Sequence, residues 1–199
     1  MTLDATKTFF QRGSVNAIHF DGLCQLQEPD CVFASIAGAV NHLVRYTVWK
    51  TARELYDACN LARIGAPTFD NVIPVAIAPV PSTLRYDLPR ERIKSDPPTV
   101  FLSELAACVT GGGIAIVSME AYETQLRITG LGCWHMFTLI DKSQEWYQVW
   151  DTNNFSGSVS ETELTTAVSA YGVGCQNKSY PHVWFHRHDK QDCLLLWRV

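Results

Sequence analysis

The chain has 199 residues and a formal net charge of −4, with 47% hydrophobic and 18% charged residues. This composition excludes a disordered protein, because a disordered chain is poorer in apolar residues and richer in net charge. The acidic balance argues against nucleic acid as the main partner, because a phosphate-binding surface needs an excess of Lys and Arg. The length fits one domain, which we expect to span residues 1–199.

The hydropathy pattern predicts no membrane partner. No segment approaches the roughly 18–20 consecutive apolar residues that cross a bilayer, and residues 1–13 contain no run of signal-peptide length. We therefore expect a cytoplasmic protein, with delivery out of the cell by a non-classical route as the alternative. The seven cysteines are scattered without a CxxC, which predicts mostly free thiols, with Cys59 and Cys108 buried in helices.

The first half of the chain is predicted to be helical. Residues 31–46 are apolar almost all round, which indicates a buried helix. Residues 51–61 begin with Thr-Ala-Arg-Glu, a capping box that predicts a second helix. Prolines punctuate residues 64–100, so we expect an irregular connection there with one short helix at 69–76. A third helix is predicted at 102–109, before three successive glycines.

The second half is predicted to be mostly strands, with one further helix. Apolar runs predict strands at 113–119, 135–141, 145–150, 182–188 and 194–199. The second and third of these are joined by a tight polar turn, so they should form a hairpin. A capping box at Ser160–Glu163 predicts a helix that reaches about residue 171. Helices followed by mostly antiparallel strands predict the α+β class.

A cysteine stands where a helix begins. Cys31 follows Gln25-Leu-Gln-Glu-Pro-Asp and falls in the first turn of the predicted buried helix. The helix dipole and the free N–H groups of that turn stabilise a thiolate, which is the nucleophilic form of cysteine. The alternative interpretation is a small residue at a crowded helix start.

A histidine and an aspartate occupy matching ends of the predicted hairpin. His135 begins one strand, and Asp151 follows the next strand sixteen residues later. Because such ends lie side by side on neighbouring strands, Asp151 can accept the imidazole Nδ1–H and orient the ring. The alternatives are a partly buried histidine and an ordinary turn aspartate. Asn153 or Asn154 takes the orienting role if the strand ends later.

Together these residues resemble the papain-like cysteine peptidases, and most closely the branch of the bacteriocin-leader (double-glycine) peptidases. That pattern has a Gln six residues before a Cys that opens a helix, often as Q-x-x-x-x-D-C, and Gln25, Asp30 and Cys31 match it. The later positions of His135 and Asp151 match as well. The resemblance covers about residues 20–155 and implies a papain-like fold, with the cysteine helix packed on a mostly antiparallel sheet.

The resemblance also implies roles and a reaction. Cys31 would be the nucleophile, His135 the general base and acid, and Asp151 the residue that orients His135. The Gln25 side chain and the Cys31 N–H would form the oxyanion hole. The expected function is a cysteine hydrolase that cleaves an amide bond of a peptide or protein through a thioester, without a cofactor. An inhibitor or immunity protein is a further expected partner.

Departures from the family pattern affect the substrate more than the fold. Val32 stands where the family usually has Gly, and Thr152 stands where bacteriocin-type members often have Pro. A glutamine deamidase or transglutaminase-type effector, and an inactive peptide-binding module, are the alternatives. Metal binding by the C-terminal region is a third, but its spacing matches no compact zinc motif, so no metal is expected. The residues concerned are His182, His186, His188 and Cys193.

Overall fold

The computed structural model describes residues 31–65, 68–89, 97–122, 131–151, 155–165 and 192–199. Its elements are α2 (Cys31–Val44), α3 (Ala52–Leu61), α4 (Phe69–Ile77), β1 (Leu84–Asp87), α6 (Pro97–Thr110), β2 (Ile114–Tyr122), β3 (Leu131–Ser143), β4 (Trp146–Asp151), β5 (Phe155–Ser160) and β6 (Asp192–Arg198). The strands form one sheet in the order β1-β6-β2-β3-β4-β5, and each described pair is antiparallel. The predicted α+β class is confirmed.

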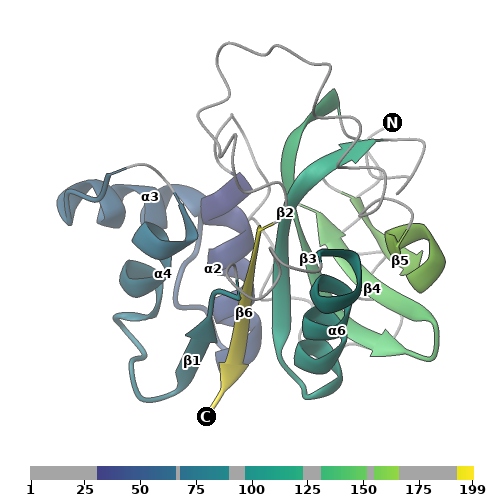
Figure 1. The fold of residues 1–199 in the computed structure, drawn as a ribbon. Helices are drawn as coiled ribbons and strands as arrows, with labels where there is room; N and C mark the ends of the chain where they lie inside the picture. The colour runs from purple at the N-terminus through teal and green to yellow at the C-terminus, as the bar shows by residue number, and fades with distance from the viewer. Residues whose placement is uncertain (1–30, 66–67, 90–96, 123–130, 152–154, 166–191) are drawn as a thin grey trace.

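Helices cover both faces of the sheet, and each face has its own core. In Figure 1, α2, α3 and α4 lie on one side of the central strands and α6 lies on the other. Alternation along β2 explains the two cores, because successive side chains of a strand point to opposite faces. Ile114 and Ile116 join the core formed with α2, whereas Ala115 and Val117 join the core formed with α6.

Helix α2 is an internal helix, as its apolar sequence predicted. Its described side chains are buried except that of His42, which is half-buried, and it packs against α3, α4 and four strands. On the α3 side, the ring centroids of Phe33 and Tyr56 lie 5.3 Å apart in an edge-to-face contact. The helix ends at Val44, earlier than predicted, because Arg45 takes a left-handed conformation with φ 65°.

Both predicted capping boxes form. At the start of α3, the Thr51 hydroxyl accepts a hydrogen bond from the Glu54 N–H at 3.2 Å. The Glu54 carboxylate in turn accepts one from the backbone N–H of Lys50 at 2.7 Å. At the end of β5, Ser160 and Glu163 exchange the equivalent bonds at 3.1 and 2.9 Å. The helix that Ser160 opens is described from residue 161 to residue 165.

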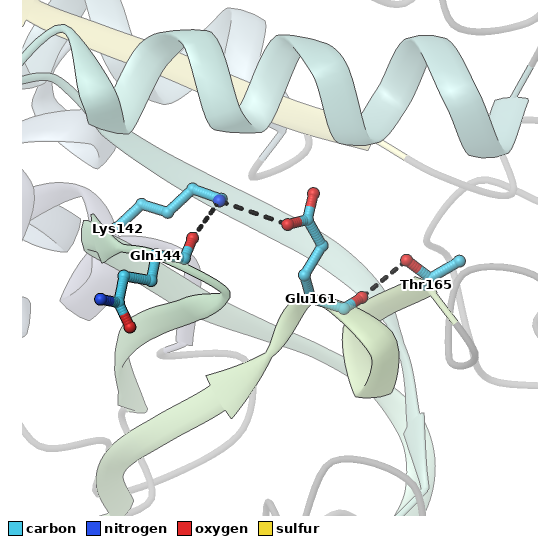
Figure 2. A network of polar contacts seen from close by, with 4 residues as sticks. All are labelled: Lys142, Gln144, Glu161 and Thr165. Atoms are coloured by element: carbon cyan, nitrogen blue, oxygen red, sulfur yellow. Dashed lines mark hydrogen bonds and ion pairs between the residues drawn. The ribbon is translucent and has the colours of Figure 1, made fainter.

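An ion pair ties the β3–β4 turn to the helix after β5. The Lys142 ammonium lies 3.2 Å from the Glu161 carboxylate and also donates to the carbonyl of Gln144, which has a φ of 54° in the turn (Figure 2). The Thr165 hydroxyl donates to the Glu161 carbonyl one helical turn later. The register of the hairpin is therefore secured at its turn end.

The structure differs from the sequence prediction in the lengths and number of its elements. Strand β1 lies within the stretch predicted to be irregular, and β5 was not predicted. Helix α6 begins at Pro97 rather than at residue 102, because proline is tolerated in the first turn of a helix. The predicted strand at 182–188 lies outside the described residues.

Candidate functional site

Cys31 is the first residue of α2. The helix has 14 residues and carries no acidic side chain in its first turn. Its free N–H groups and positive dipole end are therefore not neutralised by a carboxylate within that turn. This backbone position is the one that the sequence predicted, and it favours the thiolate form of a cysteine.

His135 and Asp151 lie on neighbouring strands, one diagonal step apart. Asp151 is the last residue of β4 and pairs with Phe137 of β3, and His135 stands two residues before Phe137. Because the pleat repeats every two residues, the positions of His135 and Asp151 belong to the same face of the sheet. The backbone thus places the two residues near each other, as the sequence predicted. However, His135 lies inside β3, which begins at Leu131, rather than at its start.

The two strand positions and the helix start lie toward the same end of the sheet. Helix α2 packs against β3, and in Figure 1 both α2 and β3 begin in the upper half of the view. Leu139 and Val149 belong to the core formed with α6, and every second residue of a strand lies on the same face. The positions of His135 and Asp151 therefore belong to the face that α6 covers. Helix α2 packs on the other face, so the backbone places Cys31 on the opposite layer from these two strand positions.

Several predicted residues lie outside the described part of the chain. They are Gln25, Asn153, Asn154, His182, His186 and His188. Cys193, the remaining member of the considered metal cluster, is fully buried in β6, where it pairs with Val117. Within the described ranges, the structure holds no group of three His, Cys, Asp or Glu residues arranged to bind a metal ion. Among the same residues, no helix is long and apolar enough to cross a membrane.

The described thiols away from Cys31 are poor nucleophiles. Cys59, Cys108 and Cys193 are buried thiols that form no disulfide, and burial was predicted for the first two. Burial raises the pKa of Cys59 to about 11 and, as the main cause, the pKa of Cys108 to about 12. The Cys108 thiol also donates to the Ile114 carbonyl at 3.3 Å. The Cys59 and Cys108 thiols stay protonated at neutral pH, so they offer an internal reference for the reactivity of Cys31.

Two buried hydroxyls, one in α2 and one in β3, were not identified from the sequence. Ser35 and Thr138 are each 0% exposed, and neither hydroxyl has a hydrogen-bond partner in the described structure. The available signal for Ser35 was its spacing of four residues from Cys31, which places both on one side of a helix. Thr138 carried no comparable signal, because threonine is common in strands.

Comparisons with known proteins find likeness at the level of structure. No family model matches the chain, and no curated protein matches it. A crystal structure named "putative C39-like peptidase" from Bacillus anthracis is 11% identical with a TM-score of 0.49, covering 88% of this chain and 94% of that one. The Pseudomonas avirulence protein AvrPphB is 13% identical with a TM-score of 0.41, covering 86% and 92%.

Proposed function

We propose that the protein is a cysteine hydrolase that cleaves an amide bond of a peptide or protein. Cys31 acts as the nucleophile, His135 as the general base and acid, and Asp151 as the residue that orients His135. Gln25 and the Cys31 N–H serve as the oxyanion donors. The observation that carries the proposal is the register of β3 and β4, which brings the positions of His135 and Asp151 within one diagonal step on the same face of the sheet.

The proposed reaction proceeds in two stages. The Cys31 thiolate attacks the amide carbonyl carbon, and the oxyanion donors stabilise the negative charge that develops on the oxygen. The C–N bond then breaks as protonated His135 gives its proton to the leaving amine, which leaves a thioester on Cys31. Water then attacks the thioester carbonyl while His135 takes its proton. The acid product leaves and the thiol is restored, so the steps need no cofactor.

The test of this proposal is selective alkylation of Cys31. Purified protein is treated with iodoacetamide, or with the epoxide inhibitor of papain-like peptidases, between pH 5 and 8, and each cysteine is followed by peptide mass spectrometry. We expect Cys31 to react fastest, because a thiolate beside an imidazolium persists below the ordinary thiol pKa. The rate should fall by about tenfold or more in His135→Ala.

A matched pair of variants tests whether an effect at Asp151 comes from its proposed orienting role or from the loss of any negative charge. Asp151→Asn should lower the alkylation rate, whereas Asp141→Asn should leave it unchanged, because Asp141 is an exposed residue farther along β3. If Cys31 in the wild-type protein reacts no faster than Cys59, Cys108 and Cys193, the proposal is wrong.

A further inference from the structure

Strand β3 does not pair with β4 residue for residue. Leu139 pairs with Val149 and Asp141 pairs with Gln148, so Ile140 stands as an extra residue between the two pairs. Two residues that oppose one on the neighbouring strand form a β-bulge, which bends the strand that carries it and increases its local twist. The bulge lies on the strand that contains His135.

The faces of the neighbouring side chains agree with the bulge. Leu139 belongs to the core formed with α6, and the Lys142 ammonium lies 5.2 Å from the centroid of the Tyr147 ring, which belongs to the same core. In a regular strand, two residues three positions apart point to opposite faces. Ile140, by contrast, packs against the core formed with α2. The bulge therefore takes up one residue between Leu139 and Lys142.

The strand is held on both sides of the bulge. On the turn side, the Lys142 ammonium lies 3.2 Å from the Glu161 carboxylate (Figure 2), and the Glu161 N–H donates to the Glu145 carbonyl at 2.7 Å. On the other side, residues 134–139 pair with β2 without interruption. The bulge thus sets the direction of the strand segment that contains His135 relative to a fixed turn.

A second irregularity lies at the other end of this segment. Trp134 of β3 pairs with Glu120 of β2, and the next pair joins Leu131 to Tyr122. In this interval two residues of β3 stand opposite one of β2. The segment that contains His135 is therefore bounded by an irregularity at each end. Bulges are over-represented next to active sites, where they change the direction of a side chain.

We propose that the bulge at Ile140 is a positioning element of the candidate site. It sets the direction of the strand segment with His135 and Asp151 relative to the start of α2, where Cys31 lies. Asp151 pairs with β3 inside this same segment, so the two residues are positioned together. This role rests on the proposed function above, and the bulge acts through these two residues rather than on the substrate.

The test removes the bulge without changing the register. Deleting Asp141 lets Ile140 pair with Gln148, so β3 and β4 become a regular hairpin. The pair of Leu139 with Val149, and every pair beyond it toward Asp151, is retained. Deleting Ile140 instead has the same effect on the pairing, but it also removes a half-buried apolar side chain. The converse variant, Ile140→Ala, loses most of that side chain and keeps the bulge.

The first readout is the alkylation of Cys31 by iodoacetamide at pH 6 and pH 8. We expect each deletion to lower the rate at pH 6 by roughly threefold to tenfold, because a displaced imidazolium stabilises the thiolate less. The fall should be smaller at pH 8, nearer the ordinary thiol pKa. Ile140→Ala should lower stability but keep the wild-type rate. An unchanged rate in the Asp141 deletion, or an equal loss in Ile140→Ala, would contradict the positioning role.

The second readout is independent of catalysis. Crystal structures of the wild-type protein and the Asp141 deletion compare the direction of residues 134–139 with that of the turn. We expect the bend at Ile140 to disappear while Asp151 stays paired with Phe137. An unchanged direction, or a shifted register, would overturn the proposal. If Cys31 of the wild-type protein shows no selective reactivity, the proposed function fails, and this comparison still decides whether the bulge directs the strand.

Discussion

Helices α2 and α6 have the same length, 14 residues, but they are held in different ways. Helix α2 has helices on one side and the sheet on the other, and its described residues are buried almost throughout. Helix α6 packs on β2, β3 and β6, and it exposes Ser103, Ala107 and Thr110. The helix that begins with Cys31 is thus fixed from two sides, whereas, among the described elements, α6 is fixed from one.

The helix layer of α2, α3 and α4 and the layer of α6 also differ in the hydrogen bonds that their polar side chains make. In the α2 layer, the Asn41 side chain bonds the backbone of the α2–α3 connection, and the Trp49 indole donates to the Ala76 carbonyl of α4 at 3.0 Å. In the α6 layer, Cys108 and Cys193 are small buried residues of an apolar core. The α2 layer is therefore positioned by hydrogen bonds as well as by packing.

The largest expected effect concerns packing inside α2. Ile36 is fully buried, and Ile36→Ala should lower the free energy of unfolding by about 3 kcal/mol, because it removes apolar contacts and leaves a cavity. The control Ala107→Gln, on the exposed side of α6, should change it by less than about 0.5 kcal/mol. Urea unfolding measures both changes. Similar losses in the two variants would remove the contrast between the helices.

A slightly smaller effect is expected at Asn41. Its amide donates to the Trp49 carbonyl at 2.7 Å and accepts from the N–H groups of Val48 and Trp49 at 2.8 and 3.0 Å. Asn41→Ala leaves these backbone groups without that partner, which should cost about 2–3 kcal/mol in urea unfolding. Asn60→Ala, at an exposed position of α3, is the matched control. A loss at Asn41 no larger than at Asn60 would show that water replaces the amide.

The smallest expected effect is a pH dependence that the two layers share. Burial raises the pKa of Cys59 and, as its largest cause, of Cys108, so the folded protein keeps both protons above pH 9 while the unfolded chain loses them. Stability should therefore fall by about 1.3 kcal/mol for each thiol between pH 8 and pH 10, because the unfolded chain loses these protons near pH 9. Urea unfolding at pH 8 and pH 10 measures the fall. Cys108→Ala should reduce its steepness, and an unchanged slope would contradict a buried protonated thiol.

Local sequence signals predicted the parts of the fold that depend on local contacts. Helix α2 was predicted because its residues are apolar on every side, and α3 was predicted from its capping box. Strand β1 was missed because its four residues, LRYD, hold their conformation by pairing with β6, more than a hundred residues later. Strand β5, FSGSVS, alternates Phe155, Gly157 and Val159 with serines, but only two of its residues are large and apolar, so the signal was weak and the strand depends on its pairing with β4.

The same distinction applies to the candidate site. Residue spacing predicted that Asp151 and His135 would lie on neighbouring strands, and the register of β3 and β4 confirms this for the backbone. Spacing did not predict the diagonal offset. The turn pairs Ser143 with Trp146, so Asp151 reaches only the level of Phe137, although the irregularity between Leu139 and Asp141 brings it one residue closer to His135. The roles of Cys31, His135, Asp151 and Gln25 remain predictions that the alkylation experiment tests.

Strand β6 has a consequence for the order in which the protein can fold during synthesis. It lies between β1 and β2, and its Leu194 and Leu196 complete the core around α2. A ribosome releases α2, α3, α4 and β1 long before residue 192, so the nascent chain has no strand to place between β1 and β2. The helix that begins at Cys31 therefore gains its full support only after residues 192–198 have been synthesised, which leaves the core around it incomplete until then.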